Sequence, residues 1–504
     1  MASYLRPGVY VQETLNPVAP VAGSASTSVA AFIGSNPRGP LTPTLVTSWS
    51  QYLNTYGGWS TNNTLALAVF LFFANGGSQA YVQRVVKGSP VAASRTLLDR
   101  AGSPATTLTV TAVNPGTWGN GASGGISISI QDSPGATGYF DMIVYYGGVS
   151  ASNKVESFPN LSMTASDPRY AVSVINSQSS YITVADGGST ATGVARNPSV
   201  VAAASGALAS GADGTAVAAA DIAGGVNAFD TVTSALVLNA PGVTDATSVN
   251  LLIAYAASRG DVFVVIDPIN DTVANQLALA ATYNSSSYAA SYYPPITIND
   301  PTNTTPGTII ANTNPGGAVV GKFVSTDKSR GVWKAPAGLS VRLAGAVSVP
   351  TLTNANLDAM NSAAAPVNAI RFIPGSGIVV MGARTLQPGY ASMYIPVRRS
   401  LIYLEKALVD LTNFAVFEPN DTVLYRRITA ILTSFLTKFW SEGGLRGSSP
   451  EQAFFVLCDS TNNLLSTVEA GQVNIQVGVS LQRPAEFVVI NIGQFDGGAT
   501  VSVA

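Results

Sequence analysis

The sequence predicts a multidomain α+β protein, and three observations carry this prediction. The chain has 504 residues, about three domains at roughly 150 residues each, and 46% of them are apolar, enough for sizeable cores. Between residues 88 and 186, polar and apolar residues alternate with the period of antiparallel strands. Outside this stretch, continuous apolar strands alternate with helical patterns, as they do in α/β layers.

The N-terminal part predicts an extended arm followed by an α/β layer. The first 25 or so residues are punctuated by prolines, and residues 8–13 (GVYVQE) alternate as a strand with no local partner. No apolar core of a secretory signal is present here. Residues 29–86 then read strand, short helix, helix, strand. The longest apolar run, residues 65–74, is too short for a membrane span of about 20 residues. Asn62 or Asn63 can begin it as a helix and Gly76 can end it, so we expect a buried helix in a soluble, cytosolic chain.

The residue composition and the polar–apolar pattern change twice in the middle of the chain. Residues 88–186 hold the alternating strands, separated by Gly, Pro and Ser turns, and end in a short helix and a strand. Residues 199–225 are nearly pure Ala, Gly and Ser, and we expect a surface loop with one short helix there. Residues 235–268 then read buried strand, helix, buried strand, which predicts a parallel βαβ unit.

The last hundred residues contain the strongest helical pattern. Apolar residues recur at i, i+4 spacing from Val423 to Trp440, which predicts one helix roughly 30 Å long. Asn420 or Asp421 can cap its start, and Gly443 can end it. A second amphipathic helix precedes it at residues 400–411. Two strands follow, at residues 473–479 and 486–492.

Charge is scarce in this chain. Only 10% of the residues are charged, against about 25% in an average protein. The 25 Lys and Arg residues are balanced by 27 Asp and Glu residues, so no basic excess exists to neutralise a nucleic-acid backbone. Because charges are depleted at the centres of interfaces, we expect much of the surface to be buried against copies of the chain.

The residue types that are missing exclude many catalytic sites. The chain has no His, so neither a Ser-His-Asp site nor an imidazole metal site can be built. Its one Cys, Cys458, excludes an internal disulfide bond and a Cys-rich metal site. Residues 121–125 (GASGG) match a nucleophile elbow, which needs a His base. Residues 316–323 (GGAVVGKF) match the spacing of a P-loop, but Phe323 stands where Ser or Thr binds Mg²⁺.

Carboxylates are the remaining candidates for acid–base chemistry. Asp267 follows a buried strand, at the end where α/β folds bind ligands, although Asp-Pro is also a common turn. The possible pairs, Asp267 with Asp271 and Glu442 with Glu451, have spacings that specify no chemistry. We therefore expect no enzymatic activity, no cofactor and no metal ion, and a P-loop or carboxylate enzyme stays an alternative.

A series of short motifs resembles the tail sheath proteins of contractile phages and related injection machines. The resemblance runs nearly end to end and is most specific in the C-terminal third. No single motif decides it, but their order and spacing agree over the whole chain. The motifs are LRPGVYVQE, FFANGGSQAYVQRV, NPGTWGN, VFVVIDP, SYYPPITIND, RGVWKAPAG, GARTL, IPVRRSLIYLEKAL, FEPND, FWSEGGLRGSSPEQAFFVLCD and RPAEFVVI.

The resemblance implies a domain organisation. It implies a discontinuous core domain of residues 24–87 and 345–485, which would face an inner tube. An antiparallel β module (residues 88–186) and an α/β module (residues 187–344) would be inserted into it and face outward. Residues 1–23 and 486–504 would be an N-terminal arm and a C-terminal strand with its arm. The boundary near residues 199–225 stays open, because the likeness is weakest there.

The resemblance also implies a function. The chain would be a structural subunit whose copies stack as hexameric rings around an inner tail tube protein. Contraction of this sleeve would drive the tube through the target envelope for genome ejection or injection. Further partners would be baseplate and tail terminator proteins, with no nucleic acid and no membrane insertion. The chain would be part of a virion tail, assembled in the host cytoplasm. The alternative from another class is a β-rich carbohydrate-binding or adhesive surface protein.

The resemblance and the strand patterns select two sets of candidate site residues. Three charged residues that follow the long helix are candidates for contact with the tube: Glu442, Arg446 and Glu451. The inter-subunit arms would pair with a neighbour's sheet through Gly8, Val9, Tyr10, Val11, Gln12, Glu13, Phe487, Val488, Val489, Ile490, Asn491 and Ile492.

Overall fold

Parallel strands from three distant parts of the chain meet in one central sheet. The computed structural model describes residues 29–59, 63–200, 206–301, 303, 305, 307–389 and 392–486. Eight strands lie in the order β18-β17-β13-β12-β11-β1-β3-β2. The two edge strands, β2 and β18, pair antiparallel, and the others pair parallel. The strands are β1 (Val29–Ser35), β2 (Thr44–Val46), β3 (Ala80–Val85), β11 (Leu236–Asn239), β12 (Val262–Ile266), β13 (Ala289–Tyr293), β17 (Val367–Ile373) and β18 (Gly377–Met381).

Helices cover both faces of this sheet, which is why its inner strands read as continuous apolar runs. One face packs against α1 (Trp49–Tyr56), α2 (Thr64–Ala74), α7 (Gly316–Arg330) and the start of α9 (Ile395–Thr412). The other face packs against α4 (Ala219–Gly224), α5 (Ala246–Arg259), α6 (Val273–Ala280) and α8 (Asn354–Ser362). The predicted buried helix is confirmed as α2, and Asn63 caps it by accepting from the Ala66 amide at 3.2 Å.

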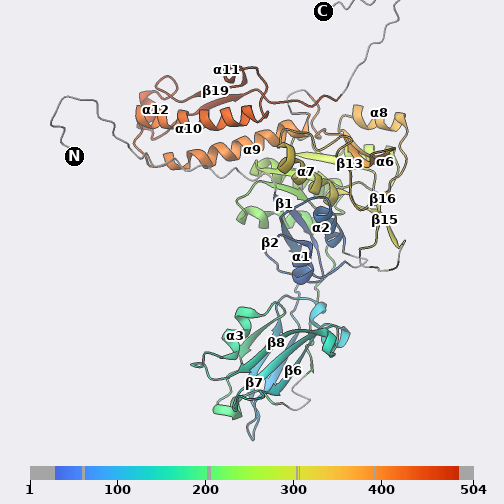
Figure 1. Ribbon diagram of the computed structural model, residues 1–504, viewed down its shortest axis with the longest axis vertical. Helices are drawn as coiled ribbons and strands as arrows, with labels where there is room; N and C mark the ends of the chain where they lie inside the picture. The colour runs from blue at the N-terminus through green and yellow to red at the C-terminus, as the bar shows by residue number, and fades with distance from the viewer. Residues whose placement is uncertain are drawn as a thin grey trace, which may run out of the picture.

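The antiparallel β module forms one end of the molecule (Figure 1). A four-stranded sheet, β10-β6-β7-β8, packs against a three-stranded sheet, β4-β5-β9, around one apolar core. The helix α3 (Ala171–Gln178) covers this core. The strands are β4 (Ser94–Leu98), β5 (Thr106–Ala112), β6 (Ile126–Asp132), β7 (Phe140–Tyr146), β8 (Lys154–Leu161), β9 (Ile182–Asp186) and β10 (Gly206–Ala207).

The strand pairing corrects the predicted end of the β module at residue 186. The short strand β10 pairs with β6, and Ala212 pairs with Val91. Residues 187–200 and 206–215 therefore belong with the β module, and α4 begins the return to the central sheet. Local composition did not reveal this, because small residues such as Gly206 and Ala207 carry no strand pattern of their own.

The pairing also corrects the prediction of a separate inserted α/β module at residues 187–344. The strands β11, β12 and β13 lie in the middle of the central sheet, between β1 and β17. β11 pairs with β1 and β13 pairs with β17, so the N- and C-terminal parts of the chain complete the sheet around this βαβ unit. Helices from these parts also help to cover its two faces, as a parallel sheet requires. The chain after β13 adds a small sheet of β14 (Ile296–Asn299), β15 (Ile309–Thr313) and β16 (Ala346–Ser348).

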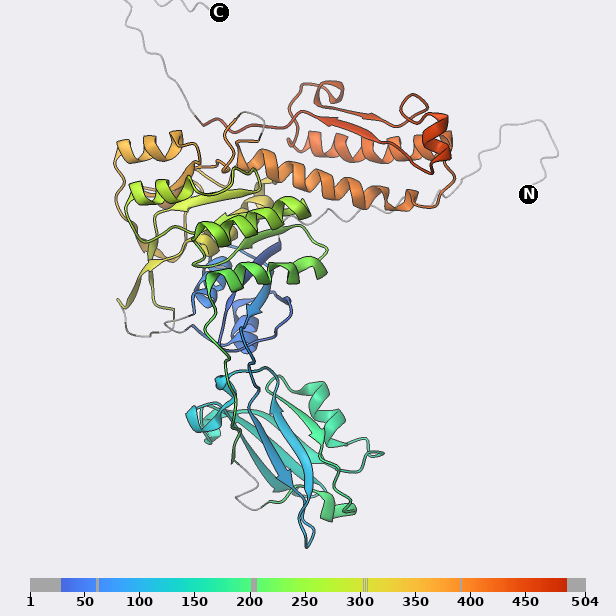
Figure 2. The same cartoon turned by 180° about the vertical axis from the view of Figure 1, so that it is seen from behind.

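A helical unit extends from the central sheet at the other end of the molecule (Figures 1 and 2). It comprises most of α9, η6 (Asn413–Ala415), α10 (Thr422–Ser441), α11 (Pro450–Ala453), β19 (Phe454–Leu457), α12 (Leu465–Glu469) and β20 (Gln476–Val479). The predicted long helix is confirmed as α10. The Asp421 carboxylate caps it by accepting from the amides of Val423 and Leu424, both at 2.9 Å. In the described part of the chain, no helix has the length and hydropathy that a membrane span needs.

Candidate functional site

The three tube-contact candidates lie in the connection between α10 and β19. Glu442 is the residue that ends α10, and Glu451 lies in the first turn of α11. The side chains of Glu442, Arg446 and Glu451 are all exposed, and within the described ranges none of them forms an ion pair. The nearby backbone N–H and the Ser449 hydroxyl hold the pKa of Glu451 below its usual value.

The backbone of this connection is held firmly. The Gly444 amide donates to Phe439 O at 2.9 Å, and the Arg446 amide donates to Ser480 O at 2.7 Å. The Trp440 indole N–H donates to Gly447 O at 3.0 Å. The segment is therefore an anchored connection that presents three unpaired charges to solvent, and their contact with a tube stays a prediction.

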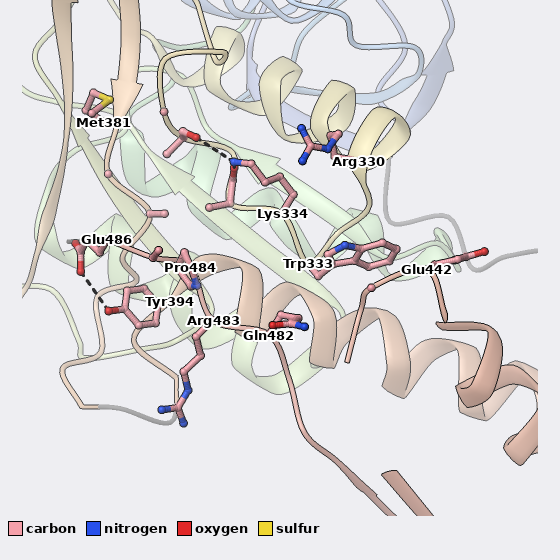
Figure 3. A pocket seen from close by; sticks show the side chains of 17 residues that line it. Arg330, Trp333, Lys334, Met381, Tyr394, Glu442, Gln482, Arg483, Pro484 and Glu486 are labelled. Carbon is pink, nitrogen blue, oxygen red and sulfur yellow. Dashed lines mark hydrogen bonds between the residues drawn. The ribbon is translucent and has the colours of Figure 1, made fainter. Parts of the chain in front are cut away.

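A cavity of about 620 Å³ lies where the helical unit meets the central sheet (Figure 3). Its wall includes Arg330, Trp333, Lys334, Glu442 and Glu486. The Lys334 ammonium donates to the carbonyl oxygens of Ala335 and Ala337, at 2.7 and 3.2 Å. Burial and the nearby Arg330 lower the pKa of Lys334. This lysine therefore ties down the loop that follows α7.

Glu486 fixes the end of the described chain to the central sheet. Its carboxylate accepts two hydrogen bonds from the Arg384 guanidinium, at 2.8 and 2.7 Å. It also accepts one from the Tyr394 hydroxyl at 3.2 Å (Figure 3). Burial, followed by the Glu486 charge, raises the pKa of Tyr394. The predicted arm residues 487–492 begin directly after this anchor. They and residues 8–13 lie outside the described residues.

The helical unit also contains a two-stranded sheet, formed by β19 and β20. β19 and β20 pair antiparallel, from Phe454 with Val479 to Leu457 with Gln476. In the described part of the chain, neither strand has a second neighbour. Phe455, in the middle of β19, is 53% exposed. Strands with an unpaired edge offer a row of free backbone donors and acceptors to another chain.

The near-match to a P-loop is part of a packed helix. Residues 316–323 lie in α7, so no phosphate-binding loop is formed. A Cβ on Gly317 would stand 2.0 Å from Ala68 O, and one on Gly321 would stand 2.6 Å from Phe72 O. These glycines let α7 approach the backbone of α2. The P-loop interpretation is therefore wrong, and the glycine spacing serves helix packing.

Asp267 is an internal anchor rather than a ligand site. Its buried carboxylate accepts from the Gly316 amide at 2.7 Å, and from the Asn239 side chain and the Gly242 amide at 3.3 Å each. A Cβ on Gly316 would stand 2.5 Å from Asp267 Oδ1, so α7 fills the space above these strand ends. Burial raises the pKa of Asp267 to about 6.

The other apparent catalytic residues are not brought together. Ser123 of GASGG is exposed in the short helix η2 (Gly121–Ser123) of the β module. Asp271 is exposed, and its carboxylate accepts from the Thr272 amide. Cys458 is buried directly after β19, where burial raises the pKa of its thiol. Among the residues that the structure describes, none is a partner that would make Ser123, Asp271 or Cys458 a nucleophile or a base.

Sequence reasoning missed the Arg384–Glu486 pair. Both residues stand in motifs that resemble sheath proteins, GARTL and RPAEFVVI, but no local pattern links them across 102 positions. The pair could have been suspected from the opposite charges of Arg384 and Glu486, because the two motifs otherwise hold few charged residues.

The chain is similar to known proteins both in sequence and in fold. No family model matches the chain. The chain is 27% identical to the tail sheath protein of Vibrio phage KVP40 over 179 residues, which are 35% of this chain. That match spans only 25% of the length of the phage protein.

Solved structures match over nearly the whole chain. The contracted sheath of an extracellular contractile injection system, PVC, is 22% identical and has a TM-score of 0.58, covering 98% of this chain and 99% of its own. The contracted helical sheath of the anti-feeding prophage is 20% identical and has a TM-score of 0.59, covering 98% and 100%. A sheath tail protein from Listeria innocua is 14% identical and has a TM-score of 0.61, covering 90% and 94%.

These neighbours carry the names of sheath proteins rather than of enzymes. The resemblance found in the sequence is thereby confirmed, and the chain has the fold of the contractile sheath proteins.

Proposed function

We propose that this chain is a structural subunit of a contractile sheath. Its copies stack as hexameric rings into a sleeve around an inner tube, with baseplate and terminator proteins at the two ends. The sleeve forms in the host cytoplasm, in an extended state, and becomes part of a tail or of a related injection particle. The chain catalyses no reaction.

One structural observation carries this proposal. The two-stranded sheet of β19 and β20 has an unpaired edge in the described part of the chain, while two strand-like segments, residues 8–13 and 487–492, flank the fold. Addition of such segments to a neighbour's sheet supplies main-chain hydrogen bonds that do not depend on how side chains pack. Arg384 and Glu486 support this interpretation, since they hold the start of the C-terminal segment in place.

Contraction would be a change between two packings of the same subunits. The energy comes from the difference in interface free energy between the extended and contracted states, so no nucleotide is consumed. The terminal strands keep subunits attached while the side-chain contacts between them change. The low charge content fits this role, because interface centres are poor in charged residues.

The segment of residues 442–452 is the proposed contact with the tube. It presents Glu442, Arg446 and Glu451 without ion-pair partners in the described structure, on an anchored backbone. Exposed charges of this kind add little affinity but set register and suppress wrong contacts.

Proline substitutions test the arm directly. Val9→Pro with Val11→Pro removes two backbone donors from the proposed strand, because proline has no N–H. We expect a folded chain, with an unchanged circular dichroism spectrum, that no longer sediments as sleeves. The matched control, Val9→Thr with Val11→Thr, keeps both donors and the β-branched shape and should assemble. Normal sleeves from the double proline variant would overturn the arm proposal.

A further inference from the structure

The β module is attached to the central sheet through a narrow neck (Figures 1 and 2). The chain crosses the neck twice, and the two crossings pair with each other. The amides of Val91 and Ala212 donate to each other's carbonyl oxygens, both at 2.9 Å, and the Thr215 amide donates to Lys87 O at 2.9 Å. A two-stranded ribbon of this length is barely stable by itself, so it cannot hold the module in one orientation.

A loop of the β module closes against the central part beside this neck. The loop is residues 114–120, the NPGTWGN motif. Its Gly116 has φ +136°, and a Cβ there would stand 2.7 Å from Pro37 O, so only glycine allows this approach. The Asp213 carboxylate accepts from the amide and the hydroxyl of Thr117, at 2.8 and 2.6 Å. Asn120 exchanges two hydrogen bonds with the backbone of Gly211, at 3.0 and 2.7 Å. The loop is thus tied to the returning crossing.

Arg38 reaches from the loop after β1 into aromatic rings of the β module. Its guanidinium carbon lies 4.6 Å from the ring centre of Trp118, 5.6 Å from that of Tyr146 and 4.4 Å from that of Tyr181. Arg38 is only 4% exposed, and in the described ranges no carboxylate pairs with it. The guanidinium donates to Asn54 O of the central part at 2.5 Å. Its charge is otherwise stabilised by the faces of three rings that the other module supplies.

Arg84, at the end of β3, binds both sides of the same contact. Its guanidinium donates to Asn36 O, Pro37 O and Gly39 O on the central part, at 2.6, 2.9 and 3.1 Å. It also donates to Pro115 O of the β module at 2.8 Å. Burial lowers the pKa of Arg84 to about 10, partly offset by the nearby Asp213, so it stays charged at neutral pH.

We propose that Arg38, Arg84 and residues 114–120 form a fixed joint, through which the β module and the central sheet behave as one rigid body. Arg38 is the positioning residue that decides the orientation, because its guanidinium is fixed to Asn54 O on the central part and meets aromatic side chains of the module rather than the paired crossings. The inference goes beyond the sheath proposal and does not depend on it, since it can be measured on the unassembled chain. It also gives the NPGTWGN motif a role, which is to seat the module against Pro37 and Arg84.

Distance measurements between the two parts test this joint. The full chain carries Cys458→Ser, and spin labels are attached at Ser173→Cys in α3 and Ala359→Cys in α8, both of which are exposed positions. We expect a narrow distance distribution that Arg38→Ala broadens. Arg38→Lys keeps the charge but loses the planar stacking, and Tyr181→Leu removes one ring, so both should broaden it less. Arg169→Ala is the matched control, because the Arg169 guanidinium donates to the carbonyl oxygens of Asn160 and Pro159, which lie within the module.

Hydrogen exchange separates a positioning role from a folding role. With Arg38→Ala, the amides of Val91, Gly116, Ala212 and Thr215 should exchange about tenfold faster or more, while interior amides of β6 and β7 keep their protection. Unchanged exchange at the neck, with an unchanged distance distribution, would overturn the joint. Equally faster exchange throughout β6 and β7 would overturn it too, since Arg38 would then only support folding. If Arg38→Ala does not fold, the same two readouts on Tyr181→Leu and Arg38→Lys decide.

Discussion

The Arg384 guanidinium holds the Glu486 carboxylate through two hydrogen bonds, at 2.8 and 2.7 Å, although 102 residues separate them in sequence. The two side chains are 15% and 22% exposed, so the pair is largely shielded from water. Arg384 also donates to Asn361 O at 2.8 Å, which fixes the guanidinium independently of Glu486. The pair therefore fixes the position of Glu486, the last residue that the structure describes.

Arg384→Ala should release this segment without unfolding the chain. Removing charge-assisted hydrogen bonds of this kind costs about 1.5–3 kcal/mol, which a chain of this size tolerates. We expect an intact fold, faster proteolytic cleavage near residue 486 and fewer or shorter sleeves. Arg371→Ala, on the neighbouring strand β17, is the control and should change none of these. Assembly of Arg384→Ala at the native rate would contradict the anchoring role.

The glycines of α7 give a paired prediction about stability. A Cβ on Gly317 would stand 2.0 Å from the backbone of Ala68, so Gly317→Ala should destabilise the fold by about 3 kcal/mol or more. Gly224 ends α4 in helical conformation with open space around it, so Gly224→Ala should stabilise the fold by about 0.4–1 kcal/mol. Thermal or chemical unfolding measures both. Equal effects of the two substitutions would contradict the close approach of α7 to α2.

Asp267 makes the stability depend on pH. Its pKa is about 6 in the fold, above the ordinary value of 3.8, so the folded state holds this proton more tightly than the unfolded state does. The resulting stability is complete below about pH 3.8, falls as the pH rises, and is gone above about pH 6. Because a pKa difference of one unit between the folded and unfolded states corresponds to about 1.4 kcal/mol, the total change in the free energy of unfolding is about 3 kcal/mol.

Asp267→Asn isolates this effect. Asn cannot ionise, so the stability of the native chain relative to the variant should fall between pH 4 and pH 6 and then stay constant. Unfolding midpoints measured in parallel at several pH values provide the comparison. A difference that is flat over this range would show that Asp267 ionises in the fold as easily as in water, and one that grows in favour of the native chain would show that it ionises more easily; either result contradicts the raised pKa.

The charges after α10 are predicted to act on assembly and not on folding. Arg446 and Glu451 are exposed and unpaired in the described structure, so Arg446→Glu with Glu451→Lys should leave the unfolding midpoint within about 0.5 kcal/mol of the native value. Assembly on isolated tubes should be lost or misregistered, and more so at low salt. The control reverses two exposed charges elsewhere, Lys328→Glu with Asp358→Lys. If both double variants cover tubes equally well, residues 442–452 are not the tube contact.

Local structure was largely predictable from the sequence. The Asn63 cap and the apolar run after it fixed α2, and Asp421 with the i, i+4 pattern fixed α10, because caps and periodicity act within a few residues. The assignment of strands to one sheet was not predictable. β11 pairs with β1, more than 200 positions earlier, and no feature of Leu236–Asn239 specifies that neighbour.

The contacts between distant parts were the least predictable. The same glycine spacing, at residues 316–321, suits both a phosphate-binding loop and the close packing of two helices. The sequence cannot separate these two roles, and only the position of α2 shows that the glycines serve helix packing. Arg38 and Glu486 look like ordinary surface charges in the sequence. The rings that cover Arg38 and the guanidinium that binds Glu486 come from far along the chain. The resemblance of short motifs included Glu486, in RPAEFVVI, but did not state what this residue contacts.

Negative-stain electron microscopy of the purified full-length chain tests the central claim most directly. A sheath subunit should form hollow sleeves of stacked rings, either spontaneously or when isolated tubes are added. The chain lacking residues 1–20 should stay a folded, unassembled protein under the same conditions. Discrete small oligomers from the full-length chain, with and without tubes, and above all ones that bind glycans, would contradict the account.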